Sequence, residues 1–357
     1  MSVYFLLLFW SFISGIIFIR KGIFSVDDIG IKKIYFVMNY LPLAIISGLR
    51  YKSVGSDTEM YHWLFYAINR TSFDFSYLGE PNHIEIGYRL LNVLIGLFTN
   101  DSQMFMLVVT FIMIFGYGHF FYKMSSNFYL TTFLFIGLFF YCETMNTLRQ
   151  SLAMMIAYNS LVFLLKEKYR YWWLGVGVAS LFHISAVLFA CAFFVKKLKQ
   201  KDIVWFGIGV AFFIFVLKVM MEDILPIFDL GKYLLYINMQ DGFGLGDIFR
   251  ILICMICLLL WQLYHKKFTF EENKNGLFFA FMTLLTAGLS FSEQYFSGFY
   301  RITMIFSVFI LLLLPLVIKY MGKIKIILYP IMFSLVVIVF YIQLNNNIHQ
   351  LLYKFFL

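Results

Sequence analysis

Charged residues are scarce in this sequence. Asp, Glu, Lys and Arg together make up 13% of its 357 residues, whereas apolar residues make up 62%. A soluble domain carries about 25% charged residues, so this composition excludes a soluble enzyme or a disordered chain. The sequence therefore predicts an all-α, polytopic integral membrane protein whose 357 residues form one transmembrane domain.

Cysteine is also rare, with four residues in the whole chain. Cys254 and Cys257 have C-x-x-C spacing, but both lie inside an apolar run and no second pair accompanies them. A packed helix face is therefore favoured over a metal or redox site. The net charge of +9 is spread over short loops, which fits a membrane topology and gives no indication of a nucleic-acid partner.

Long apolar runs recur along most of the chain, and a bilayer core of about 30 Å needs about 20 such residues per helix. We expect roughly 10–12 transmembrane helices, some of them short re-entrant segments. The expected spans cover residues 3–20, 31–49, 103–122, 128–146, 150–166, 203–221, 248–264, 275–292, 299–319 and 324–344, with less regular segments at 86–99 and 171–195.

The distribution of Lys and Arg predicts how the chain is oriented. Arg20, Lys21, Lys32 and Lys33 crowd the first loop, and basic loops stay in the cytoplasm. The N-terminus then faces outward. On this interpretation two loops are extracytoplasmic: 50–84, which includes a short amphipathic helix, and the acidic loop 222–247.

Two segments do not fit simple crossings. Segment 171–195 has basic residues at both ends, and a re-entrant pair of half-helices that turns within 180–185 would satisfy both ends. That turn would bring His183 to membrane depth. Segment 86–99 is about 21 Å long as a helix, which is too short to cross the bilayer.

Arg149 and Gln150 interrupt the oily run from Phe128 to Leu165. A charge at membrane depth costs roughly 2.5–3.5 kcal/mol on insertion scales, so it is kept mainly where it lines a cavity, pairs or does chemistry. A purely structural role would still require a partner such as Glu143. Function and structure are therefore about equally favoured for Arg149 on the sequence alone.

The loop after the second span contains Arg50, Asp57 and Tyr61. Ser56 and Glu59 have the spacing of a capping box, which predicts a helix from Asp57 to about Ile68. The N–H groups at its start could bind an anion. An ordinary surface helix beside a snorkelling arginine explains the same residues, and for this segment alone it is favoured.

Three other polar residues stand at the edges of apolar runs. Glu85 could be a base or a solvated acid at a helix start. His183 is, by itself, more often a satisfied core histidine. Arg301 opens a long apolar run and could be an interface anchor. No Asp-x-Asp pair of the kind that holds a metal near a nucleotide sugar occurs in a predicted outside loop.

Taken in order, these segments resemble EpsG-like, Wzy-type polysaccharide polymerases. The resemblance covers about residues 40–315, each motif is short, and the specificity comes from their order. The matching elements are R-x-x-x-V-G-x-D-x-x-x-Y from Arg50 to Tyr61, E-x-G-Y from Glu85 to Tyr88, R-Q-x-x-A from Arg149 to Ala153, F-H-x-S-A from Phe182 to Ala186, and an arginine before a late span at Arg301.

The resemblance implies a GT-C-like glycosyltransferase in the bacterial cytoplasmic membrane. It would join undecaprenyl-pyrophosphate-linked oligosaccharide repeat units on the outer face, in O-antigen, capsule or exopolysaccharide synthesis. Its partners would be the lipid-linked donor and acceptor, membrane lipid and a chain-length regulator. No cofactor or metal is expected, because arginines can meet the charge of the pyrophosphate leaving group.

The same resemblance suggests roles for individual residues. Arg149, Arg301 and Arg50 would contact the pyrophosphate, with Gln150 and Tyr61 also in the substrate site. The candidate bases for the acceptor hydroxyl are Asp57, Glu85 and His183, and the sequence does not choose among them.

Two other classes remain open at this point. A flippase or other transporter of lipid-linked oligosaccharides would also carry membrane-embedded Arg, Glu and His, although no internal repeat typical of transporters is visible. A membrane acyltransferase would use an intramembrane histidine but leaves the element from Arg50 to Tyr61 unexplained.

Overall fold

The computed structural model describes residues 2–20, 29–70, 84–219, 244–295 and 299–356. Within these ranges the chain is helical, and its only β contact is an isolated bridge between Arg50 and Phe355. This confirms the prediction of an all-α polytopic membrane protein. Most of the predicted loop 222–247 and the end of loop 50–84 lie outside the described residues.

The chain divides into two compact units, one of Met1–Val187 with Pro330–Leu357 and one of Leu188–Tyr329. The division falls within two helices, η2 (Ile184–Cys191) and α17 (Ile324–Asn346). The prediction of a single transmembrane domain stays a prediction.

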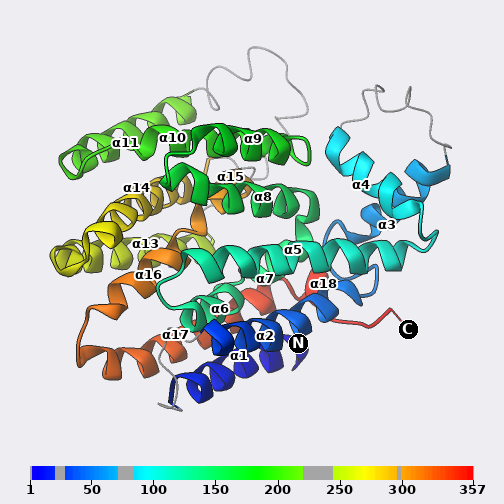
Figure 1. Ribbon diagram of the computed structural model, residues 1–357, viewed down its shortest axis with the longest axis horizontal. Coiled ribbons are helices and arrows are strands. Elements are labelled where there is room, and N and C mark those ends of the chain that lie inside the picture. Colours follow the sequence, from blue (N-terminus) through cyan, green and yellow to red (C-terminus); the bar gives the residue numbers. More distant parts are fainter. Residues whose placement is uncertain (1, 21–28, 71–83, 220–243, 296–298, 357) are drawn as a thin grey trace. The chain divides into compact units, whose positions relative to one another are not determined.

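The first unit carries four of the five motifs, and its helices can be followed in Figure 1. They are α1 (Ser2–Arg20), α2 (Ile29–Gly48), α3 (Thr58–Arg70), α4 (Ile86–Gly96), α5 (Ser102–Met124), α6 (Phe128–Gly137), α7 (Phe140–Asn146), α8 (Leu148–Leu165), α9 (Tyr169–Ser180) and α18 (Ile348–Leu351). Helix α5 packs along α2 on one side and α8 on the other, α8 also packs along α9, and α3 contacts both α4 and α5.

The second unit is built around a helical hairpin of α13 and α14. Its helices are α10 (Ala192–Val195), η3 (Gln200–Asp202), α11 (Ile203–Val219), α13 (Leu245–Tyr264), η6 (His265–Lys267), α14 (Phe270–Ser292), α15 (Phe299–Ser307) and α16 (Ile310–Lys319). Helix α14 contacts α11, α13, α15 and α16. Cys254 and Cys257 are fully buried on α13, which agrees with the interpretation of a packed helix face.

Six helical segments are long and apolar enough to cross a membrane, judged over the described residues, and a seventh is obtained if the bent pair α6–α7 counts as one span. The six are Ser102–Met124, Leu148–Leu165, Leu245–Lys267, Phe270–Ser292, Phe299–Lys319 and Ile324–Asn346. Further apolar helices are shorter than this test requires. The expected 10–12 crossings therefore include segments that do not pass as full-length spans.

Two predicted irregularities are found, and a third was missed. Helix α4 has 11 residues, about 16 Å, as expected for a short segment. Helix α9 ends at Ser180 and a 3₁₀ helix starts at Ile184, so the chain breaks where the turn was predicted. The segment predicted as a straight span over 128–146 is broken: α6 and α7 meet at 54°, because Phe139 has a left-handed φ of 72° that ends the first helix.

Candidate active site

The carboxylate of Glu85 is the centre of a polar cluster in the first unit. Nη1 of Arg149 donates to Oε2 of Glu85 over 2.8 Å, and the backbone N–H of Ile184 donates to Oε1 over 3.2 Å. Nδ1 of His183 lies 3.8 Å from the same Oε1. The three side chains are each about one-fifth exposed, at 17% for Glu85 and 20% for Arg149 and for His183. Three separate sequence motifs therefore meet at one partly open carboxylate.

The E-x-G-Y element fixes this carboxylate in place. Glu85 is the N-cap residue of α4 but does not cap the helix with its side chain, which leaves the carboxylate free to face Arg149. The N–H of Gly87 donates to the carbonyl of Leu181 over 2.7 Å. A Cβ atom at Gly87 would lie 2.7 Å from that same oxygen, so only glycine permits the approach. Tyr88 is fully buried below it.

Arg149 lies in the first turn of α8, next to the break that separates α7 from α8 at Thr147. Its Nε is buried and, among the described residues, has no hydrogen-bond acceptor. A structural role for Arg149 requires an anionic partner, and the structure shows that this partner is Glu85. One nitrogen of the guanidinium, Nε, is still without an acceptor among the described residues. A buried donor of this kind is a candidate contact for an acceptor atom of a ligand. Gln150, the next residue, is buried.

Tyr61 on α3 interacts with Arg149 of the cluster and is almost completely buried. Burial raises the pKa of Tyr61, the nearby carboxylate of Asp57 raises it further, and interaction with the Arg149 guanidinium acts in the opposite direction. Asp57 is partly exposed, and its carbonyl accepts the N–H of Tyr61 over 3.1 Å. Helix α3 begins at Thr58, one residue later than predicted. Asp57 and Tyr61 therefore lie close together at the start of α3, and Arg149 interacts with Tyr61.

His183 occupies the break after α9. The N–H of Ser185 donates to Nδ1 of His183 over 3.2 Å. A neutral imidazole that accepts at Nδ1 carries its proton on Nε2. In that tautomer the ring offers a hydrogen-bond donor rather than a basic nitrogen at Nε2.

Arg50 lies inside the protein and is 0% exposed. Its Nε donates to the carbonyl of Val54 over 3.1 Å and to the hydroxyl of Thr58 over 3.2 Å. Its Nη groups donate to the carbonyl of Ser47 and, over 3.4 Å, to the carbonyl of Met145. Burial lowers the pKa of Arg50 to about 10, so the side chain remains charged at neutral pH. In this structure its donors serve the loop after α2 and the end of α7.

The C-terminal segment also forms hydrogen bonds with the loop after α2. The N–H of Tyr51 donates to the carbonyl of Lys354 over 2.8 Å, and the N–H of Gly55 donates to the carbonyl of Gln350 over 2.6 Å. The hydroxyl of Tyr353 reaches the carbonyl of Ile46 over 2.9 Å. The element from Arg50 to Tyr61 is therefore held by the bond from the Arg50 side chain to Met145 on α7 and by backbone bonds to Gln350 and Lys354.

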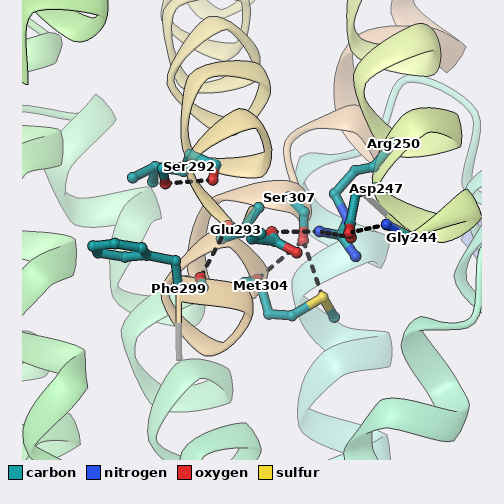
Figure 2. A network of polar contacts seen from close by, with 10 residues as sticks. Gly244, Asp247, Arg250, Ser292, Glu293, Phe299, Met304 and Ser307 are labelled. Atoms are coloured by element: carbon teal, nitrogen blue, oxygen red, sulfur yellow. Dashed lines mark hydrogen bonds and ion pairs between the residues drawn. The ribbon is translucent and has the colours of Figure 1, made fainter. Parts of the chain in front are cut away.

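Arg301 belongs to the second unit, where it is exposed on α15. This unit also contains a cluster that the sequence interpretation missed, shown in Figure 2. Nη1 of Arg250 donates to Oε1 of Glu293 over 2.6 Å, and Oδ1 of Asp247 lies 3.7 Å from the same nitrogen. The signal was present in the sequence: Arg250 is a lone cation inside the apolar run of α13, which is the pattern that drew attention to Arg149.

Together, the fold and these sites define an all-α polytopic membrane protein with two charged clusters at helix ends. The model of the EpsG family matches residues 33–356, and the chain belongs to this family. Membership supports a polysaccharide-polymerase type of function carried out by a glycosyltransferase-like membrane protein. No curated protein and no solved structure matches the chain.

Proposed function

We propose that this protein is a polymerase that joins undecaprenyl-pyrophosphate-linked oligosaccharide repeat units on the outer face of the bacterial cytoplasmic membrane. Family membership supports the polymerase class. The observation that carries the assignment to this site is the pairing of Glu85 with Arg149, with His183 at 3.8 Å. Transfer to an acceptor hydroxyl from a pyrophosphate donor needs a base and a cation close together.

Arg149 is the proposed contact for the pyrophosphate of the donor. A guanidinium stays charged at any physiological pH and can bind two phosphate oxygens at once. Its Nε has no acceptor among the described residues, so a donor atom remains to be satisfied. Its place in the first turn of α8 adds the positive end of a helix dipole to the charge of the side chain.

Glu85 is the proposed base. When the pyrophosphate takes the Nη groups of Arg149, Oε2 of Glu85 is released and can accept the proton of the acceptor hydroxyl. The acceptor oxygen then forms its bond to the anomeric carbon of the donor, and the bond from that carbon to the phosphate oxygen breaks. Undecaprenyl pyrophosphate leaves as an anion that Arg149 stabilises, so no proton donor is needed on the leaving side.

His183, Asp57 and Gln150 are proposed to orient the acceptor. With Nδ1 engaged by Ser185, His183 can donate from Nε2 to a sugar oxygen. Asp57 is partly exposed and lies close enough to Tyr61 to influence its pKa, so it can accept from a sugar hydroxyl near the cluster. Arg50 is proposed as a positioning residue, since its bonds are to the protein itself.

The test is the length of surface polysaccharide in the native host, compared between wild type, Arg149→Ala and Arg149→Lys at equal membrane abundance. Arg170→Ala, an exposed arginine on α9, is the matched control. The proposal expects the Arg149→Ala strain to display single repeat units and the Arg170→Ala strain to display normal chains. If repeat units instead accumulate inside the cell and none reaches the surface, the protein is a flippase.

A further inference from the structure

The cluster of Asp247, Arg250 and Glu293 joins the start of α13 to the end of α14 (Figure 2). It is mostly enclosed: the exposed fraction is 14% for the side chain of Arg250 and 5% for that of Glu293. Asp247 also accepts the N–H of Gly244 over 3.2 Å, which fixes the first turn of α13. A charge-assisted pair of this length, held on both helices, is a rigid connection.

The same cluster reaches the first turn of α15. The guanidinium carbon of Arg250 lies 5.1 Å from the ring centroid of Tyr300, within the range of a cation–π contact. The hydroxyl of Thr303 interacts with Glu293 and donates to the carbonyl of Phe299 over 3.0 Å. Tyr300 and Thr303 are three residues apart and lie on one face of α15.

Arg301 lies between these two contacts but does not share their face. Successive residues of an α-helix are rotated by about 100°, so Arg301 is directed away from the side that Tyr300 and Thr303 present to the cluster. Its side chain is exposed, whereas Thr303 is fully buried. The cluster therefore fixes the rotation of α15, and that rotation decides where Arg301 points.

The protonation of Glu293 in this cluster changes near neutral pH. It contains two carboxylates and one guanidinium, and burial raises the pKa of Glu293 to about 7 against the opposing effect of Arg250. Within the described residues, the charged groups that act on Glu293 are Asp247 and Arg250 on α13, and the titratable Tyr300 on α15 contacts Arg250. The strength of the contact between Arg250 and Glu293 thus depends on the protonation of Glu293.

We propose that Arg250 and Glu293 are positioning residues of the transfer reaction, which hold α15 so that Arg301 contacts the pyrophosphate of a lipid-linked substrate. This inference rests on the proposed function and on the family resemblance, which suggests that Arg301 contacts the phosphate. Neither Arg250 nor Glu293 touches the substrate in it. They affect the rate of transfer only by setting the position of Arg301.

A double-mutant cycle on the purified full-length protein tests this route. The substrate is the lipid-linked oligosaccharide extracted from the native host after deletion of this protein, and the readout is the initial rate of chain extension. We expect Arg301→Ala and Arg250→Met each to lower the rate on the order of 10- to 100-fold, as misplacement of a binding group by about 1 Å can. The double variant is expected to be no slower than Arg301→Ala, because the two residues act as one unit.

Two conservative variants test whether a loss of rate is caused only by misfolding. Arg250→Lys and Glu293→Gln keep the size and polarity of the cluster, and their unfolding temperatures in detergent report on the fold. The wild type is expected to change its rate near pH 7, and the Glu293→Gln protein is expected to lose that change. Glu271→Gln, an exposed residue on the same helix, is the control and is expected to keep the wild-type profile.

The outcomes separate the two proposals. If the effects of Arg250→Met and Arg301→Ala multiply, or if Arg250→Lys and Glu293→Gln extend chains with the wild-type rate and pH profile, the positioning role is wrong while the polymerase assignment stands. If Arg301→Ala and Arg149→Ala both leave chain extension at the wild-type rate, the proposed function itself is wrong.

Discussion

Glu85 and Arg149 are 64 residues apart in the sequence, and their side chains meet at 2.8 Å. The carboxylate belongs to a helix of 11 residues, and the guanidinium belongs to the first turn of a long apolar helix. Their contact brings the E-x-G-Y and R-Q-x-x-A elements together, and His183 adds the third motif at 3.8 Å. Three of the motifs that carry the family resemblance therefore share one location in this chain.

The carboxylate of Glu85 is expected to be needed for catalysis. Glu85→Gln keeps the shape of the side chain but removes the base, and general-base catalysis is typically worth about 10²- to 10⁴-fold. The rate of chain extension by the purified protein should fall within that range. Glu59→Gln is the matched control, since Glu59 is exposed and, within the described part of the chain, forms an ion pair with the exposed Lys52 alone, at 3.6 Å. An equal loss in both variants would contradict the assignment.

Arg50 is expected to matter for stability before it matters for catalysis. Arg50→Met removes the Arg50 donor from the carbonyls of Ser47 and Met145 inside the protein, and leaves the carbonyl of Val54 with the Thr58 hydroxyl as its donor. Leaving a buried acceptor without its donor costs about 1–3 kcal/mol. The unfolding temperature in detergent should drop clearly for Arg50→Met and remain close to wild type for Lys52→Met, which changes an exposed neighbour. An unchanged temperature in Arg50→Met would refute the positioning role.

Gly55 is expected to tolerate no side chain. Its φ is +97°, and a Cβ atom would lie 2.8 Å from the carbonyl oxygen of Met145. Gly55→Ala should therefore destabilise the protein by about 1–3 kcal/mol and displace the loop that leads to Tyr61. Gly177→Ala provides the contrast, because a Cβ there meets nothing within 4 Å in a helix. That variant should be neutral or slightly stabilising, in line with helix propensity, and equal unfolding temperatures for the two would contradict the prediction.

The stability of the protein is expected to fall as pH rises from about 4.5 to about 7. Burial raises the pKa of Glu293 from 4.5 to about 7, so in this window the folded state binds more protons than the unfolded state. The unfolding free energy then decreases with pH, by a total of about 3 kcal/mol from this group. Denaturant unfolding of wild type and Glu293→Gln across that range measures it.

The matched control for this prediction is Glu271→Gln, which changes an exposed carboxylate on the same helix. The Glu271→Gln protein should keep the pH slope of the wild type, and the Glu293→Gln protein should lose it. A slope that persists in Glu293→Gln would show that another group is responsible.

The class of the protein and its irregular segments followed from the sequence. Apolar runs and loop charge are local properties, so membrane helices, the short segment at Ile86–Gly96 and the break near His183 could all be predicted without knowing any contact. Even so, the local pattern missed the bend at Phe139, because no proline stands there and a left-handed residue leaves no mark in hydropathy.

The partners of each charged residue were decided only by the tertiary structure. The sequence left Arg149 without a definite partner, and its family resemblance suggested Arg50 as a phosphate contact. The tertiary structure pairs Arg149 with Glu85 and encloses Arg50 among carbonyls. Likewise, Arg250 and Glu293 lie 43 residues apart and meet because α13 and α14 form a hairpin. Hydropathy depends on the residue itself, but an ion pair depends on the direction in which two distant helices present their side chains.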